Sequence, residues 1–95
     1  MADTLLSKAK LVLRISEDNT DFDTEIKSLI DASLFDMGLA GVEKRDETDP
    51  LIERAVMTYV KANFGEIKTD VYNRLKLSYD EQKAQLAMSL DHRGE

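Results

Sequence analysis

Side chains that could do acid–base or metal chemistry gather in residues 16–36, which hold seven acids and a single base. Four of these acids stand close together: Asp18, Asp21, Asp23 and Glu25. Such a cluster could bind a hard cation, but calcium loops need a glycine at the sharp turn and a distal bidentate glutamate. Thr24 and Glu25 follow Asp23 directly, so neither requirement is met. We therefore predict a helix start with acids at the positive end of the helix dipole, and no metal site.

Covalent and phosphate chemistry have even less support. The chain has no cysteine and one histidine, His92, which lies beside Arg93 near the C-terminus. Residues 89–95 are polar and expected to fray, so His92 is expected to lack the partners that an acid–base dyad needs. The four glycines are scattered and form no phosphate-binding loop. We therefore predict no catalytic residue, no cofactor and no enzymatic activity.

The charge of the chain is unevenly spread. The net charge is −6; residues 1–15 contribute +2, and residues 16–36 contribute −6 from seven acids and one base. An acidic surface repels phosphate backbones and anionic lipid, so we expect no tight binding to nucleic acid or to membranes. No run of about 18 apolar residues is present, so no membrane-spanning helix is predicted. The acids expected on this surface are Asp18, Asp21, Asp23, Glu25, Asp31 and Asp36.

Apolar residues recur at helical spacing in four segments, which we predict as helices over residues 4–14, 20–37, 50–64 and 70–88. No segment alternates apolar and polar residues as a half-buried strand does. The sequence therefore predicts an all-α fold, a compact bundle of about four helices, two of them long, without a sheet. Residues 1–95 are expected to form a single domain.

The predicted helix ends rest on local capping signals. Thr20 is expected to cap the second helix, with Asp23 as its partner three residues on. Gly38 is expected to adopt the left-handed conformation just past the end of that helix. Asp49 is expected to cap the third helix, with Pro50 as its first residue and Gly65 as its stop.

Three tyrosines fall within the third and fourth predicted helices: Tyr59, Tyr72 and Tyr79. Tyrosine is enriched at protein interfaces, so these side chains could anchor a partner. Half-buried core tyrosines with hydrated hydroxyls explain the same pattern equally well. Both interpretations remain open.

The third and fourth helices, joined by residues 65–69, could also form a helix-turn-helix. Arg74, Lys76 and Lys83 would then face DNA. The fourth helix also carries three acids and a long apolar face, which favours a role in the core. A small nucleic-acid-binding regulator is therefore the alternative function.

Four stretches, taken in order, resemble the head–tail connector (adaptor) family of tailed phages and prophages. The first is residues 9–15 (AKLVLRI), followed by an acidic break. The second joins residues 21–26 (DFDTEI), 29–32 (LIDA) and 36–38 (DMG). The third joins residues 49–52 (DPLI), 55–56 (AV), 58–61 (TYVK) and 63–65 (NFG). The fourth runs from Tyr79-Asp80 through Leu86 to Ser89.

The resemblance implies an all-helical protein that assembles with itself into a ring of roughly a dozen copies. It implies a portal protein on one side, the next head-completion or tail protein on the other, and DNA passing through without specific binding. Such a protein would be made in the bacterial host cytoplasm and would lie at the head–tail junction of the virion. The acids of residues 16–36 could line the channel and repel the DNA backbone. A solvated outer face explains them as well, and both alternatives remain open.

Overall fold

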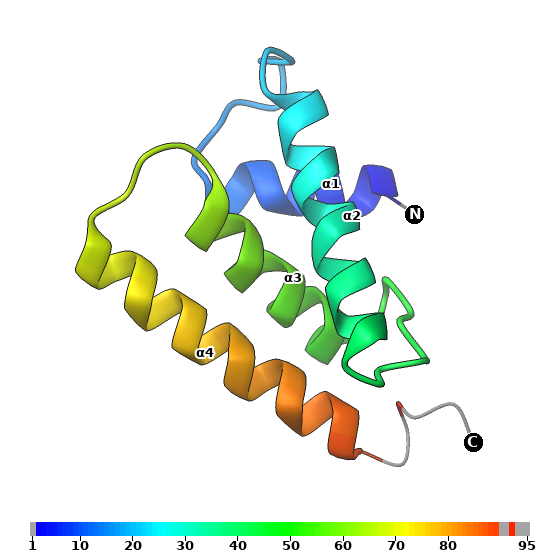
Figure 1. The fold of residues 1–95 in the computed structure, drawn as a ribbon. Coiled ribbons are helices and arrows are strands. Elements are labelled where there is room, and N and C mark those ends of the chain that lie inside the picture. The colour runs from blue at the N-terminus through cyan, green and yellow to red at the C-terminus, as the bar shows by residue number, and fades with distance from the viewer. Residues whose placement is uncertain (1, 90–91, 93–95) are drawn as a thin grey trace.

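The computed structural model describes residues 2–89 and His92. These residues form four α-helices and no strand: α1 (Ala2–Val12), α2 (Asp23–Leu39), α3 (Pro50–Asn63) and α4 (Thr69–Met88) (Figure 1). The predicted all-α fold of four helices, two of them long, is confirmed. The molecule is flattened, with extents of 40 × 31 × 18 Å. In the part of the chain that the structure describes, no helix is long and apolar enough to cross a membrane.

Helix α3 is the centre of the fold because it contacts each of the other three helices. It runs between α2 and α4, while α1 crosses behind α2 (Figure 1). Burying one large aliphatic side chain contributes about 1.5–3 kcal/mol, so the core that these helices share dominates stability. Its fully buried members are Leu5, Ala9, Ile26, Ile30, Met37, Val42, Ile52, Ala55, Val56 and Val60.

Both ends of α3 follow the local signals in the sequence. The Asp49 carboxylate accepts a hydrogen bond from the backbone N–H of Leu51 at 2.9 Å, and Pro50 is the first helical residue. After the helix, Gly65 adopts a φ of +64°, a conformation that side chains with a Cβ rarely take. The predicted cap, start and stop are confirmed.

The start of α2 differs from the prediction. The helix begins at Asp23, not Thr20, and no side chain caps it. Asn19 instead accepts the backbone N–H of Asp21 at 3.0 Å, which holds residues 19–21 in a turn. Phe22 then packs edge-on against Phe64, with ring centroids 5.5 Å apart. This tertiary contact, together with the turn, outweighs the local capping signal.

The end of α2 also differs. Gly38 lies inside the helix, and Gly41 takes the positive φ, at +101°. The later stop places Val42 in the core, where it is fully buried. Gly38 has a different use: a Cβ at this position would lie 2.7 Å from the Arg45 guanidinium. The missing side chain therefore makes room for Arg45, which donates to the Val42 carbonyl.

The chain after α4 differs from the expectation of a frayed tail at His92, which is only 6% exposed. Its backbone carbonyl accepts hydrogen bonds from the N–H groups of Glu43 and Lys44, at 2.8 and 3.0 Å. His92 is buried because of this long-range contact with the α2–α3 loop, which no local sequence pattern predicts. The other residues of the expected tail past Ser89 lie outside the described residues.

Candidate functional site

The three tyrosines come together in one place. Tyr59 from α3 and Tyr72 and Tyr79 from α4 line an open groove of about 250 Å³. Tyr79 is buried and meets the Tyr59 ring edge-on, with centroids 5.1 Å apart. Tyr79 therefore belongs to the core, while Tyr59 and Tyr72 are half-buried at the groove. A role for these two rings at an interface stays a prediction.

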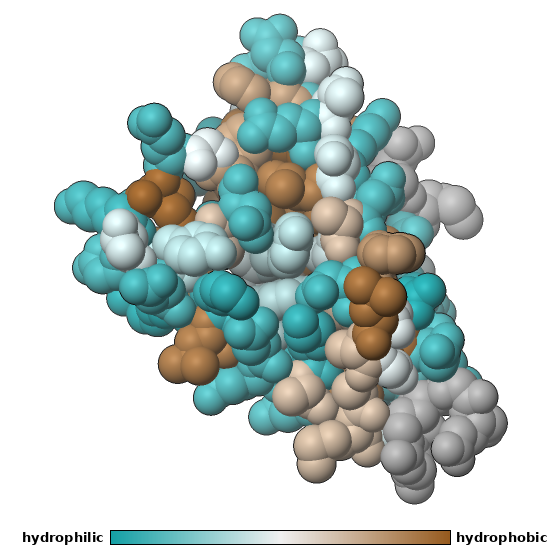
Figure 2. All heavy atoms as spheres, viewed as in Figure 1, coloured by the Kyte–Doolittle hydropathy of each residue, from teal (hydrophilic) through white to brown (hydrophobic). Residues whose placement is uncertain are grey.

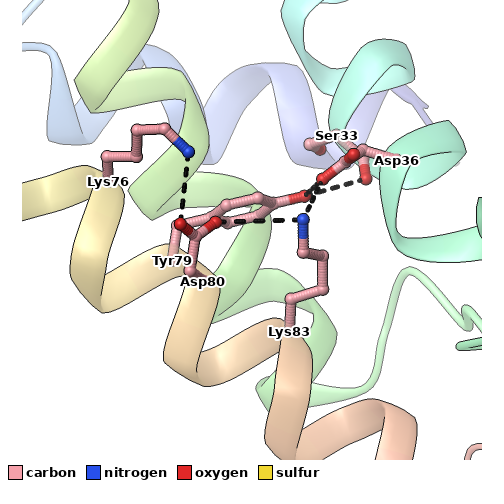
Figure 3. Close-up of polar contacts among 6 residues, drawn as sticks. All are labelled: Ser33, Asp36, Lys76, Tyr79, Asp80 and Lys83. Carbon is pink, nitrogen blue, oxygen red and sulfur yellow. Dashed lines mark hydrogen bonds and ion pairs between the residues drawn. The ribbon is translucent and has the colours of Figure 1, made fainter. Parts of the chain in front are cut away.

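Polar side chains that line this groove form a cluster that joins α2 to α4 (Figure 3). The Tyr79 hydroxyl donates to the Asp36 carboxylate at 2.7 Å and lies 3.3 Å from the Ser33 carbonyl oxygen. Lys83 donates to the same Asp36 oxygen at 2.8 Å, and its ammonium lies 5.1 Å from the Tyr79 ring centroid. Since α2 and α4 do not pack along their lengths, this cluster fastens two otherwise separate helices.

The charge states of the cluster follow from its geometry. Burial alone would raise the pKa of Asp36, but hydrogen bonds from Lys83 and Tyr79 outweigh it, and the net pKa is lowered. Burial and the neighbouring Asp36 carboxylate raise the pKa of the Tyr79 hydroxyl far above its ordinary value. At neutral pH, Asp36 is thus a carboxylate acceptor and Tyr79 a neutral donor. This arrangement suits a structural joint, because neither group is poised to exchange a proton.

The bases of α4 that could face DNA are mostly engaged within the chain. Lys76 forms an ion pair with Asp80 at 3.2 Å, and Lys83 pairs with Asp36 and lies 3.8 Å from Asp80. Arg74 is exposed and makes no ion pair with the described residues. α3 and α4 also lie side by side in opposite directions, not at the steep angle of a helix-turn-helix (Figure 1). The structure therefore gives the DNA-binding alternative little support.

The six acids predicted for the acidic surface divide into two groups. Asp23 pairs with the buried Lys10 at 2.9 Å, and Asp36 belongs to the α2–α4 cluster. The other four are exposed and make no ion pair with described residues: Asp18, Asp21, Glu25 and Asp31. Among the described residues, no group of acids and histidines is arranged to hold a metal ion.

A second set of polar contacts, here called the His92 joint, was not predicted from the sequence. It consists of His92, Asp49 and Ser89. The Nε2 of His92 lies 2.8 Å from the Asp49 carboxylate, and its Nδ1 lies 3.0 Å from the Ser89 hydroxyl. The contact lowers the pKa of Asp49, mainly through the His92 hydrogen bond and next through the Leu51 N–H. Asp49 and His92 are 43 residues apart, so no local spacing could have paired them.

Serine, histidine and aspartate in contact invite comparison with a catalytic triad. Here two of the members lie at helix ends, and His92 contacts both of them. Asp49 is the N-cap of α3, and Ser89 is the C-cap of α4. The N–H groups of Glu43 and Lys44, the nearby loop donors, bind the His92 carbonyl. The arrangement therefore fastens the C-terminal segment to the α2–α3 loop.

Comparison with known proteins agrees with the resemblance seen in the sequence. A family described as "Phage connector protein" matches residues 5–93, nearly the whole chain. No curated protein and no solved structure matches it. The matched range includes all of α2, α3 and α4, together with the α2–α4 cluster and the His92 joint. The chain thus belongs to the phage connector protein family.

Proposed function

We propose that this chain is a structural subunit of a head–tail connector ring. About a dozen copies would dock below the portal of a tailed phage, extend the DNA channel and support the next head-completion or tail protein. The observation that carries this proposal is the connector-family match over residues 5–93, on a fold built only of helices. The subunit would be made in the bacterial host cytoplasm and would act in the virion at the head–tail junction. This role requires neither a catalytic residue nor a cofactor.

Acids at one end of the molecule supply the channel lining in this proposal. Asp18, Asp21 and Glu25 are exposed, unpaired within the described residues, and close to the N-terminal end of α2. A ring repeats each of them in every copy, so the lining would carry a dense negative charge. Such a lining repels the DNA backbone and lets the duplex pass without being held.

The mass of the assembly tests the main proposal. Light scattering or native mass spectrometry is applied to the chain alone and to the chain mixed with a portal. A ring-sized species in either sample is the expected result. A chain that remains a monomer in both samples would contradict the proposal.

The channel lining has its own test in DNA retention. The triple variant D18N/D21N/E25Q removes three charges per copy while keeping the shape of each side chain. We expect the variant assembly to retain duplex DNA more strongly than wild type at low salt, and the difference to vanish as salt screens the charges. Equal retention by the two assemblies would place these acids on the outer wall. Tight, salt-sensitive duplex binding by the free wild-type chain would instead favour the regulator.

A further inference from the structure

Two exposed apolar stripes lie on two helices, α2 and α4, that do not pack along one another. On α2, Phe35 and Leu39 are 69% and 74% exposed. On α4, Leu77 and Met88 are 62% and 77% exposed. Figure 2 shows apolar side chains at the surface over the C-terminal half of α2 and, separately, over α4. Since α3 lies between these two helices, the stripes cannot cover one another within one chain (Figure 1).

Each stripe also carries a free charge, and the two charges are opposite. Asp31 precedes Phe35 by one helical turn, and Arg74 precedes Leu77 by almost one turn. Both charged side chains are exposed, and neither makes an ion pair with the described residues. Each stripe therefore has a charge about one turn before its first apolar residue, and the α4 stripe also carries the exposed Glu81 between Leu77 and Met88.

We propose that the α2 stripe of one copy docks on the α4 stripe of the next, with the two helices parallel. Asp31 then faces Arg74, and Phe35 lies beside Leu77. At 1.5 Å per residue, Leu39 lies about 12 Å beyond Asp31, between the levels of Glu81 and Ala84. The contact joins two different faces, so it continues from copy to copy and closes into a ring when the rotation allows. This inference rests on the proposed function and names the surfaces that would build the ring.

A second copy of the chain is the occupant that the charges favour. A parallel pairing of either stripe with its own copy would bring Asp31 close to Asp31, or Arg74 close to its counterpart, and like charges repel. An antiparallel pairing of the α2 stripe with its own copy would place Asp31 against the apolar Leu39, where the charge has no partner. The head-to-tail arrangement pairs opposite charges and covers Phe35 and Leu77 with one another, while Leu39 lies against Ala84. An exposed ion pair changes association only about two- to fivefold, so the apolar residues supply most of the affinity.

The absence of cysteine makes disulfide trapping a clean test, because engineered thiols are the only ones present. The double variant D31C/R74C, in the full chain under mild oxidation, should give a ladder of covalent multimers. The single variants D31C and R74C should give no covalent multimers, because each lacks the facing thiol. The control variant D31C/M88C has its second thiol about 21 Å along α4 from residue 74, and should give no ladder.

Charge and apolar substitutions test the same contact without cross-linking. D31K or R74E should weaken self-association about two- to fivefold, and the double variant D31K/R74E should restore it. Leu39→Ser should weaken it at least about tenfold. Dimers from a single-cysteine variant, or an absent D31C/R74C ladder, would overturn the inference. If ring-sized species still form without that ladder, this contact is wrong while the proposed function stands.

Discussion

The hydroxyl of Tyr79 offers the sharpest test of how the fold is held together. Tyr79→Phe removes one oxygen atom and leaves the ring in place, so core packing against Tyr59 is preserved. The lost oxygen donates to Asp36 at 2.7 Å and thereby links α4 to α2. The substitution therefore removes the contacts of this hydroxyl with Asp36 and, at 3.3 Å, with the Ser33 carbonyl oxygen, and leaves the rest of the α2–α4 cluster in place.

The magnitude follows from the geometry of that bond. A hydrogen bond to a charged group contributes about 1.5–3 kcal/mol. The Asp36 side chain is 38% exposed and retains Lys83, so water and the ammonium compensate for part of the loss. We expect a cost of about 1–1.5 kcal/mol, which corresponds to a fall in Tm of about 5–10 °C for a domain of this size.

Urea unfolding followed by circular dichroism measures this cost, and Tyr72→Phe is the matched control. Tyr72 lies on the same helix and lines the same groove, but its hydroxyl has no hydrogen bond to the described residues. We expect the control to cost less than about 0.5 kcal/mol. Equal costs for the two variants would show that the Tyr79–Asp36 bond is not what stabilises the joint.

The pH dependence of the same pair of proteins adds an independent check. The pKa of Asp36 is lowered in the folded state, so its contribution is complete above the ordinary value of 3.8 and is lost as the pH falls below it. A protonated Asp36 is also a weaker acceptor for Tyr79. The stability gap between wild type and Tyr79→Phe should therefore narrow below about pH 4. A gap that stays constant into strong acid would refute the assigned bond.

Three further outcomes follow from the loops and the His92 joint. Gly41→Ala should cost about 1–2 kcal/mol in urea unfolding because of its positive φ. Gly38→Ala should cost less, because alanine favours the helix and only the flexible end of the Arg45 side chain has to move. His92→Ala should speed amide exchange at Glu43 about five- to tenfold in NMR measurements, because the carbonyl that binds this N–H loses its anchoring ring. Wild-type stability should fall below about pH 4, since the pKa of Asp49 is lowered in the folded state, and Asp49→Asn should flatten that fall.

The elements that sequence predicted correctly are those whose signals are local. Asp49 and Pro50 start α3 because a side-chain cap and a fixed φ act within three residues. The failures arose where a distant contact decided the outcome. Thr20 had a valid capping pattern, but Phe22 packs on Phe64, and α2 starts later. Local propensity sets the preference, and tertiary packing overrides it at the ends of elements.

The contrast between local signals, which sequence reveals, and distant contacts, which it does not, is stronger at the candidate site. The tyrosines could be recognised from their type, but not the fact that one groove collects them. Lys83 and Asp36 are 47 residues apart, and His92 and Asp49 are 43 apart, so each pair depends on the completed fold. The clearest available signal was indirect, in that a lone histidine and a predicted N-cap each had unused hydrogen-bonding capacity.

The placement of polar and apolar groups in this chain connects its fold to its proposed role. Asp36, Tyr79 and Lys83 occupy the inner side of α2 and α4, where an isolated bundle would place aliphatic residues. Phe35 and Leu77 remain on the outer sides of the same helices, where an isolated bundle would place charges. Inner ion pairs specify one geometry more strictly than they stabilise it, and outer apolar groups gain free energy only when another surface covers them. A subunit that must present two faces at a fixed relative orientation needs both properties.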